Sequence, residues 1–154
     1  MPIVPSYKRD LQCYGGLMDA TAAVALDDAV VAKVTFDATL GPTAYNCSVS
    51  TTDDNITVYT SGIYQYSFEA DVTIPTTAAV VTVSVRDDAT NITGALASVG
   101  FITAELSTKR HLAINGIAQI AAGSVLDVVG LCSVDQTATF TNARFWVRKI
   151  SPAA

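Results

Sequence analysis

Few side chains in this sequence could do chemistry, and His111 is the first of them. It is the one histidine of the 154 residues and follows Lys109 and Arg110 in a segment that indicates a turn. A hydrolase built on it would need a nucleophile on one side of the imidazole and a carboxylate on the other. No Gly-x-Ser-x-Gly motif is present to supply that nucleophile. A lone histidine in a turn is typical of a solvated surface, so we predict no catalytic residue and no enzymatic activity.

Three pairs of adjacent aspartates are the next candidates, at Asp27-Asp28, Asp53-Asp54 and Asp87-Asp88. Calcium takes carboxylate and carbonyl oxygens from loops of this kind, and the second and third pairs offer them. Aspartates also end strands and accept hydrogen bonds within their own turns. We adopt this second interpretation and predict no metal and no cofactor.

The three cysteines, Cys13, Cys47 and Cys132, are the third group of candidate residues. They allow at most one disulfide within the chain and leave one thiol over. No Cys-x-x-Cys pair is present, and the spacing does not indicate a zinc site. Because disulfides are uncommon in cytosolic chains, we expect three buried or half-buried thiols.

The composition excludes several classes of protein. Hydrophobic residues make up 50% of the chain and charged residues 15%, which is typical of one folded domain. The net charge of −5 offers no positive footprint for phosphates, so nucleic acid is not expected as a partner. Apolar runs stay far below the ~20 residues of a membrane helix, and residues 1–10 lack the apolar core of a secretory signal. We therefore expect a protein made in the cytoplasm, with no membrane span and no secretion signal.

The clearest structural element is the segment 63–74. Tyr64, Tyr66 and Phe68 begin a row of apolar side chains that alternates with polar ones, which is the period of a strand with one buried face. We predict that these three aromatic residues lie in the core. Further strands are expected at residues 34–38, 80–85, 99–106, 112–120, 125–134, 137–141 and 143–150. About eight to ten short strands separated by turn residues predict an all-β sandwich or barrel.

The chain divides into three predicted parts. Residues 1–29 are expected to form an irregular N-terminal arm, because they contain prolines and a basic pair and show no clear strand alternation. The alanine- and valine-rich stretch 20–32, which crosses the end of this part, has an ambiguous period that fits a helix or a strand. Residues 30–151 form the predicted sandwich domain, and residues 152–154 form a short tail.

Four segments, in order along the chain, resemble a known family. They are Val34–Asp37, Tyr59–Phe68, Gly116–Leu126 and Ala143–Ile150. Over residues 31–150 the chain resembles the jelly roll of tumour-necrosis-factor-like and complement-type globular heads, although Ser124 stands where the family usually has aspartate. The resemblance implies a jelly-roll β-sandwich.

The resemblance also implies a homotrimer, in which the sheet that contains the strand after Gly62 faces a threefold axis. Successive side chains of a strand alternate, so the residues between the core aromatic residues point toward that axis. The matching strand 112–120 contributes to the same interface. The predicted trimer interface therefore consists of outward residues from these two strands: Ile63, Gln65, Ser67, Ala113 and Asn115.

The family further implies a protein that presents a surface. It includes phage head and tail fibres and spore-surface proteins, and the acidic, threonine-rich chain fits the phage setting. We therefore expect a non-enzymatic virion structural protein of a bacteriophage. It would be a trimeric head fibre or decoration protein whose N-terminal arm binds a capsid or tail protein. The alternative is the tip of an adhesin on a fibre or spore surface, which binds a host-surface receptor or a glycan.

Overall fold

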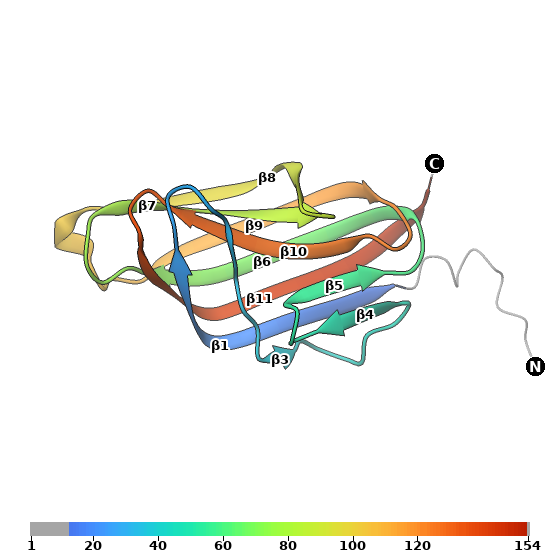
Figure 1. Ribbon diagram of the computed structural model, residues 1–154. Helices are drawn as coiled ribbons and strands as arrows, with labels where there is room; N and C mark the ends of the chain where they lie inside the picture. Colours follow the sequence, from blue (N-terminus) through green and yellow to red (C-terminus); the bar gives the residue numbers. More distant parts are fainter. Residues whose placement is uncertain (1–12, 154) are drawn as a thin grey trace, which may run out of the picture.

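The computed structural model describes residues 13–153, which form eleven strands and one short 3-10 helix (Figure 1). The elements are, in chain order, β1 (Tyr14–Leu26), β2 (Ala32–Lys33), β3 (Ala38–Thr39), β4 (Cys47–Ser50), β5 (Asn55–Val58), β6 (Gly62–Thr73), β7 (Ala79–Asp87), β8 (Thr90–Phe101), η1 (Thr103–Glu105), β9 (Arg110–Ile120), β10 (Val125–Cys132) and β11 (Gln136–Pro152). No helix in this part of the chain is long and apolar enough to cross a membrane.

The strands form two antiparallel sheets that pack against each other (Figure 1). One sheet has five strands in the order β3-β1-β11-β6-β9. The other has the order β4-β5-β10-β7-β8, and β2 pairs with β10. Strands far apart in the chain are neighbours, since β1 pairs with β11 and β6 pairs with both β11 and β9. The predicted all-β fold, a jelly-roll sandwich, is confirmed.

The core lies between the sheets, and β6 supplies several of its largest side chains. Tyr64, Tyr66 and Phe68 are 0%, 3% and 0% exposed, so the structure buries all three. Phe68 meets Phe140 of β11 edge to face, with ring centroids 6.5 Å apart. The ring of Tyr66 lies against Gly116 of β9, where any side chain would collide with it. The aromatic row therefore packs β6 tightly against both of its neighbouring strands.

The prediction that residues 1–29 form an arm outside the sandwich is wrong for much of that range. Residues 14–26 form β1, which lies between β3 and β11 and pairs with β11 along nearly its whole length. Residues 1–12 lie outside the described residues. The predicted tail also begins too early, because Pro152 is the last residue of β11.

A change of phase within β1 explains the error. Leu17 and Asp19 are buried in the first half of the strand, whereas Ala22 and Val24 are buried in the second half. At the break, the Asp19 carboxylate accepts a hydrogen bond from the backbone N–H of Thr21 at 2.8 Å. A period of two read across the whole segment is lost at such a break. Alanine and glycine, which have low strand propensity, weaken the pattern of each half further.

The partner strand β11 also changes phase, at Asn142. This residue has a φ of 53° and lies where the ladder with β6 is irregular, between Thr141 and Arg144. The expected strands 137–141 and 143–150 are therefore one continuous strand with a bulge. Bulges redirect side chains, and here Asn142 and Arg144 are both exposed on the sheet.

Candidate functional site

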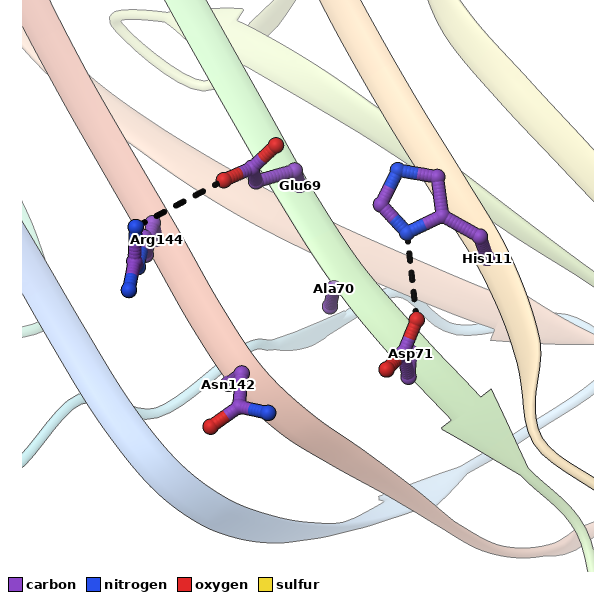
Figure 2. A pocket seen from close by; sticks show the side chains of 6 residues that line it. All are labelled: Glu69, Ala70, Asp71, His111, Asn142 and Arg144. Atoms are coloured by element: carbon purple, nitrogen blue, oxygen red, sulfur yellow. Dashed lines mark hydrogen bonds and ion pairs between the residues drawn. The ribbon is translucent and has the colours of Figure 1, made fainter.

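A polar pocket beside the bulge of β11 contains the histidine that the sequence singled out (Figure 2). Its volume is about 330 Å³. Strand β6 contributes three residues, β9 contributes the histidine, and β11 contributes two residues from the bulge. The lining consists of Glu69, Ala70, Asp71, His111, Asn142 and Arg144. The pocket therefore depends on the alignment of three strands that are distant in the sequence.

His111 lies in β9 and not in the expected turn, directly opposite Asp71 of β6. Its Nδ1 atom is 3.1 Å from Oδ1 of Asp71, and its side chain is 62% exposed. Glu69 and Arg144 form a wider ion pair, with their closest charged atoms 4.0 Å apart. Figure 2 shows the two pairs side by side in the pocket.

The pocket holds two of the three parts of a hydrolytic triad. A carboxylate that orients an imidazole is present, but no serine, threonine or cysteine is among the lining residues. The arrangement can offer hydrogen-bonding groups and charged side chains to a partner. It has no nucleophile of its own, so it gives no support to an enzymatic function.

The five predicted interface residues lie together on the outward side of the β6–β9 ladder. Ser67 is opposite Asn115, and Ala113 is opposite Glu69. Ala113 and Asn115 are exposed, and Ser67 is 8% exposed. The remaining two, Ile63 and Gln65, are half-buried. The five residues lie on the same side of the sheet because side chains alternate along β6 and β9. Their role in a trimer stays a prediction.

Two apolar residues on the same side of the sheet were not among the predicted interface residues. Ile117 of β9 is 62% exposed and lies opposite Gln65, and Trp146 of β11 is half-buried and lies opposite Ser67. An apolar residue at an outward position of an alternating strand is the signal that could have identified them. We define the outer face as seven of the outward residues of β6, β9 and β11: Ile63, Gln65, Ser67, Ala113, Asn115, Ile117 and Trp146.

A second cavity, of about 320 Å³, lies next to Trp146 between β1, β11 and the loop after β3. Tyr14, Pro42 and Arg148 also line it. The guanidinium of Arg148 donates a hydrogen bond from Nη2 to Oε1 of Gln65 at 2.7 Å, which fixes its position. Aromatic faces beside a charged donor are suited to a ligand with an apolar ring and polar edges.

Two of the aspartates considered as calcium ligands accept hydrogen bonds from backbone N–H groups. Oδ1 of Asp54 accepts a hydrogen bond from the N–H of Phe36 at 2.7 Å. Oδ1 of Asp88 accepts one from the N–H of Val125 at 2.9 Å. Both bonds join segments that are distant along the chain, so these two carboxylates hold neighbouring segments together and do not cap their own turns as expected.

A third acidic cluster brings the Asp27-Asp28 pair next to Asp135, with carboxylate oxygens within 4.8 Å of one another. Asp135 accepts a hydrogen bond from the N–H of Asp28 at 2.9 Å. Asp27 accepts hydrogen bonds from the N–H groups of Ala29 and Val30, and these lower the pKa of its carboxyl. Hydrogen bonds from backbone N–H groups therefore account for the positions of the Asp27 and Asp135 carboxylates.

Comparison with known proteins identifies the fold. No family model matches the chain, and no curated protein matches its sequence. Among solved structures, the globular domain of a zebrafish complement 1qA protein superposes with a TM-score of 0.68 at 11% identity, covering 92% of this chain and 99% of that domain.

Two tumour-necrosis-factor-type structures are similar as well. Eiger TNF from S. frugiperda gives a TM-score of 0.58 at 12% identity and covers 90% of this chain and 96% of its own. Murine APRIL gives 0.56 at 10% identity and covers 84% of this chain and 99% of its own. The chain therefore has the jelly-roll fold of complement globular heads and tumour-necrosis-factor-like proteins.

Proposed function

We propose that this jelly roll is a non-enzymatic structural protein that assembles as a homotrimer and presents its remaining surface outward. The outer face carries the proposal. Ile117 is exposed on β9, the edge strand of the sheet, and Ile63 is its diagonal neighbour across the β6–β9 ladder, within reach of side-chain contact. Trp146 adds a third apolar side chain on the neighbouring strand. Apolar side chains exposed on one face of a sheet favour binding of another protein there.

The polar residues of the outer face suit close packing of three copies. Ser67, Ala113 and Asn115 are small, so another chain can approach the sheet closely. Asn115 and Gln65 carry amides, which have both donors and acceptors and can pair with the same group of a symmetry-related copy. Arg148 already holds the Gln65 amide at 2.7 Å, so that group is oriented before assembly.

The second part of the proposal is the setting, a bacteriophage virion in which the trimer is a head fibre or a decoration protein. The support is the sequence, which is acidic and rich in threonine and contains nine lysines and arginines in all. The capsid or tail protein would bind the part of the predicted arm that precedes β1. The structural neighbours support the fold and do not bear on this setting.

Replacing Ile117 by glutamate tests the outer face. In a trimer the new carboxylates would be buried in the interface and would repel one another, so we expect a monomer. Ile102→Glu is the matched control, because Ile102 is also an isoleucine, is also 62% exposed and lies outside the outer face. Light scattering during size-exclusion chromatography reads out the mass. Trimers of both variants would contradict the proposal.

A second candidate function is recognition of a glycan or host-surface receptor, which the cavity beside Trp146 favours. Its lining joins two aromatic rings, Tyr14 and Trp146, to the fixed guanidinium of Arg148. A glycan array with the native protein and with Tyr14→Ala tests this function. Binding that Tyr14→Ala abolishes would support the adhesin, and no binding by the native protein would exclude a glycan.

A further inference from the structure

Two thiols, a tyrosine and a lysine meet inside the sandwich, at the end where β1 begins and β11 ends. Cys13 precedes β1, Cys47 begins β4, Tyr64 lies in β6 and Lys149 lies in β11. Their exposed fractions are 1%, 7%, 0% and 5%. Neither the polar pocket nor the outer face uses any of these four groups.

A short backbone bridge holds the two thiols in place. Tyr14 and Tyr45 exchange N–H···O bonds of 3.1 and 3.0 Å, which fixes Cys13 and Cys47 on neighbouring segments. Asn46, between the bridge and Cys47, has a φ of 52° and breaks the strand alternation there. Both thiols consequently lie in the core, although regular alternation would place them on opposite sides.

Lys149 is the unusual member of the cluster, because a buried ammonium needs a compensating anion. Its Nζ donates a hydrogen bond to Oγ1 of Thr60 at 3.1 Å, and it has no carboxylate partner among residues 13–153. The chain makes space for its stem at Gly62, where a side chain would collide with Cε of Lys149 and lie 2.6 Å from the carbonyl oxygen of Ser151. The buried position of this lysine is therefore built into the fold.

The two thiols differ in acidity because the contact between them shifts their pKa values in opposite directions. In their neutral forms, Cys13 donates to the carbonyl of Asn46 at 3.3 Å and Cys47 donates to that of Tyr14 at 3.0 Å. A hydrogen bond from Cys47 lowers the pKa of the Cys13 thiol, and Tyr64 and Lys149 lower it further against the opposing effect of burial. The same contact raises the pKa of the Cys47 thiol. Cys13 is thus the thiol that ionises first.

We propose that Cys13 and Cys47 are an oxidisable pair, in which Lys149 stabilises the Cys13 thiolate and a peroxide converts the pair to a disulfide. The Cys13 thiolate attacks one oxygen of hydrogen peroxide, the O–O bond breaks, and the leaving hydroxide takes a proton to become water. The Cys47 sulfur then attacks the resulting sulfenic acid, the S–O bond breaks, and the released hydroxide leaves as water with the Cys47 proton. Two thiols lose two electrons in all, and one peroxide is reduced to two waters.

The product is a covalent link between the start of β1 and the start of β4, which belong to different sheets. Peroxide is small and can reach buried thiols through local opening at the end of the sandwich. The link would close the loop between the two cysteines, so oxidised protein should unfold at a higher temperature than reduced protein.

Peptide mass spectrometry of the full chain after peroxide treatment, without reductant, tests the pair. We expect a linked peptide that contains Cys13 and Cys47, with Cys132 left as a free thiol. In Cys47→Ala the second step cannot occur, so a sulfenic acid should persist on Cys13 and be trapped by dimedone. Oxidation of Cys132 in preference to Cys13, or no linked peptide at all, would overturn the proposal.

Lys149→Met tests the role of the lysine, with Lys109→Met as the matched control because Lys109 is exposed. Losing the ammonium should lower the thiolate fraction of Cys13 at neutral pH, so oxidation should slow about two- to threefold and recover at higher pH. The control should react at the native rate. If Lys149→Met is folded and reacts at the native rate at neutral pH, the lysine has no such role. If it does not fold, the Cys47→Ala trapping experiment alone decides the proposal.

Discussion

Phe68 is the residue at which the packing of the fold can be tested most simply. It is fully buried and touches Phe140 edge to face. Phe68→Ala removes a whole ring from the core, and we expect the free energy of unfolding to fall by ~3–5 kcal/mol. Val80→Ala is the control, because Val80 is 44% exposed and its truncation should change stability by less than about 1 kcal/mol. Urea unfolding measures both, and equal effects would show that Phe68 is not a core residue.

Asp54 gives the pH dependence that the structure predicts most clearly. Burial raises the pKa of its carboxyl, although the N–H of Phe36 and the charge of Lys33 act in the opposite direction. The folded state therefore holds this proton more tightly than the unfolded state does. The stabilising contribution of the group is present below its unfolded pKa and is lost as pH rises through the raised folded pKa.

Asp54→Asn should remove this loss of stability. Asparagine keeps an oxygen that can accept the Phe36 N–H bond, and it tolerates the φ of 54° at this position. We expect a higher melting temperature than that of the native protein at pH 7, with the difference shrinking as the pH falls. Asp53→Asn, at the exposed neighbour, should show a smaller change at pH 7. A lower melting temperature of Asp54→Asn at pH 7 would contradict the assignment.

At the scale of the elements, predictability depends on whether the alternation is continuous. The segment 63–74 has an unbroken period of two, and β6 is found within one residue of it. In β8 the expected segment 99–106 overlaps only the last residues of the strand, because Gly94, with a φ of 81°, and exposed small residues give no apolar row. The sequence after β8 then forms the short helix η1 instead of continuing as a strand. An exposed strand without an apolar row, such as β8, is therefore the part of this fold that the pattern does not reveal.

Strand β1 leads to a prediction that differs from the expectation for a free arm. Deleting residues 1–20 would remove the first half of β1, including the fully buried Leu17, and would leave that part of β11 without its partner. We expect the truncated chain to lose its cooperative unfolding transition. Leu17→Ala should lower the free energy of unfolding by ~2–5 kcal/mol in the intact chain. A truncated chain that melts like the native protein would show that β1 is dispensable.

At the scale of the whole molecule, the sequence alternation predicts which residues of β6 point outward, but it does not predict which residues of other strands lie beside them on the outer face. The alternation in β6 places Ile63, Gln65 and Ser67 on one side without any knowledge of the fold. That Trp146 lies opposite Ser67 depends on the register between two distant strands, which local pattern does not determine. The polar pocket was not predictable for the same reason, because it needs the bulge at Asn142 as well as the pairing of three strands.

Sedimentation equilibrium of the native chain tests the central claim most directly, because it gives the mass of the assembly without reference to shape. The account predicts a single species of three times 16.1 kDa at micromolar concentration, in which each outer face packs against the neighbouring copies around a threefold axis. A stable monomer of 16.1 kDa under the same conditions would contradict it.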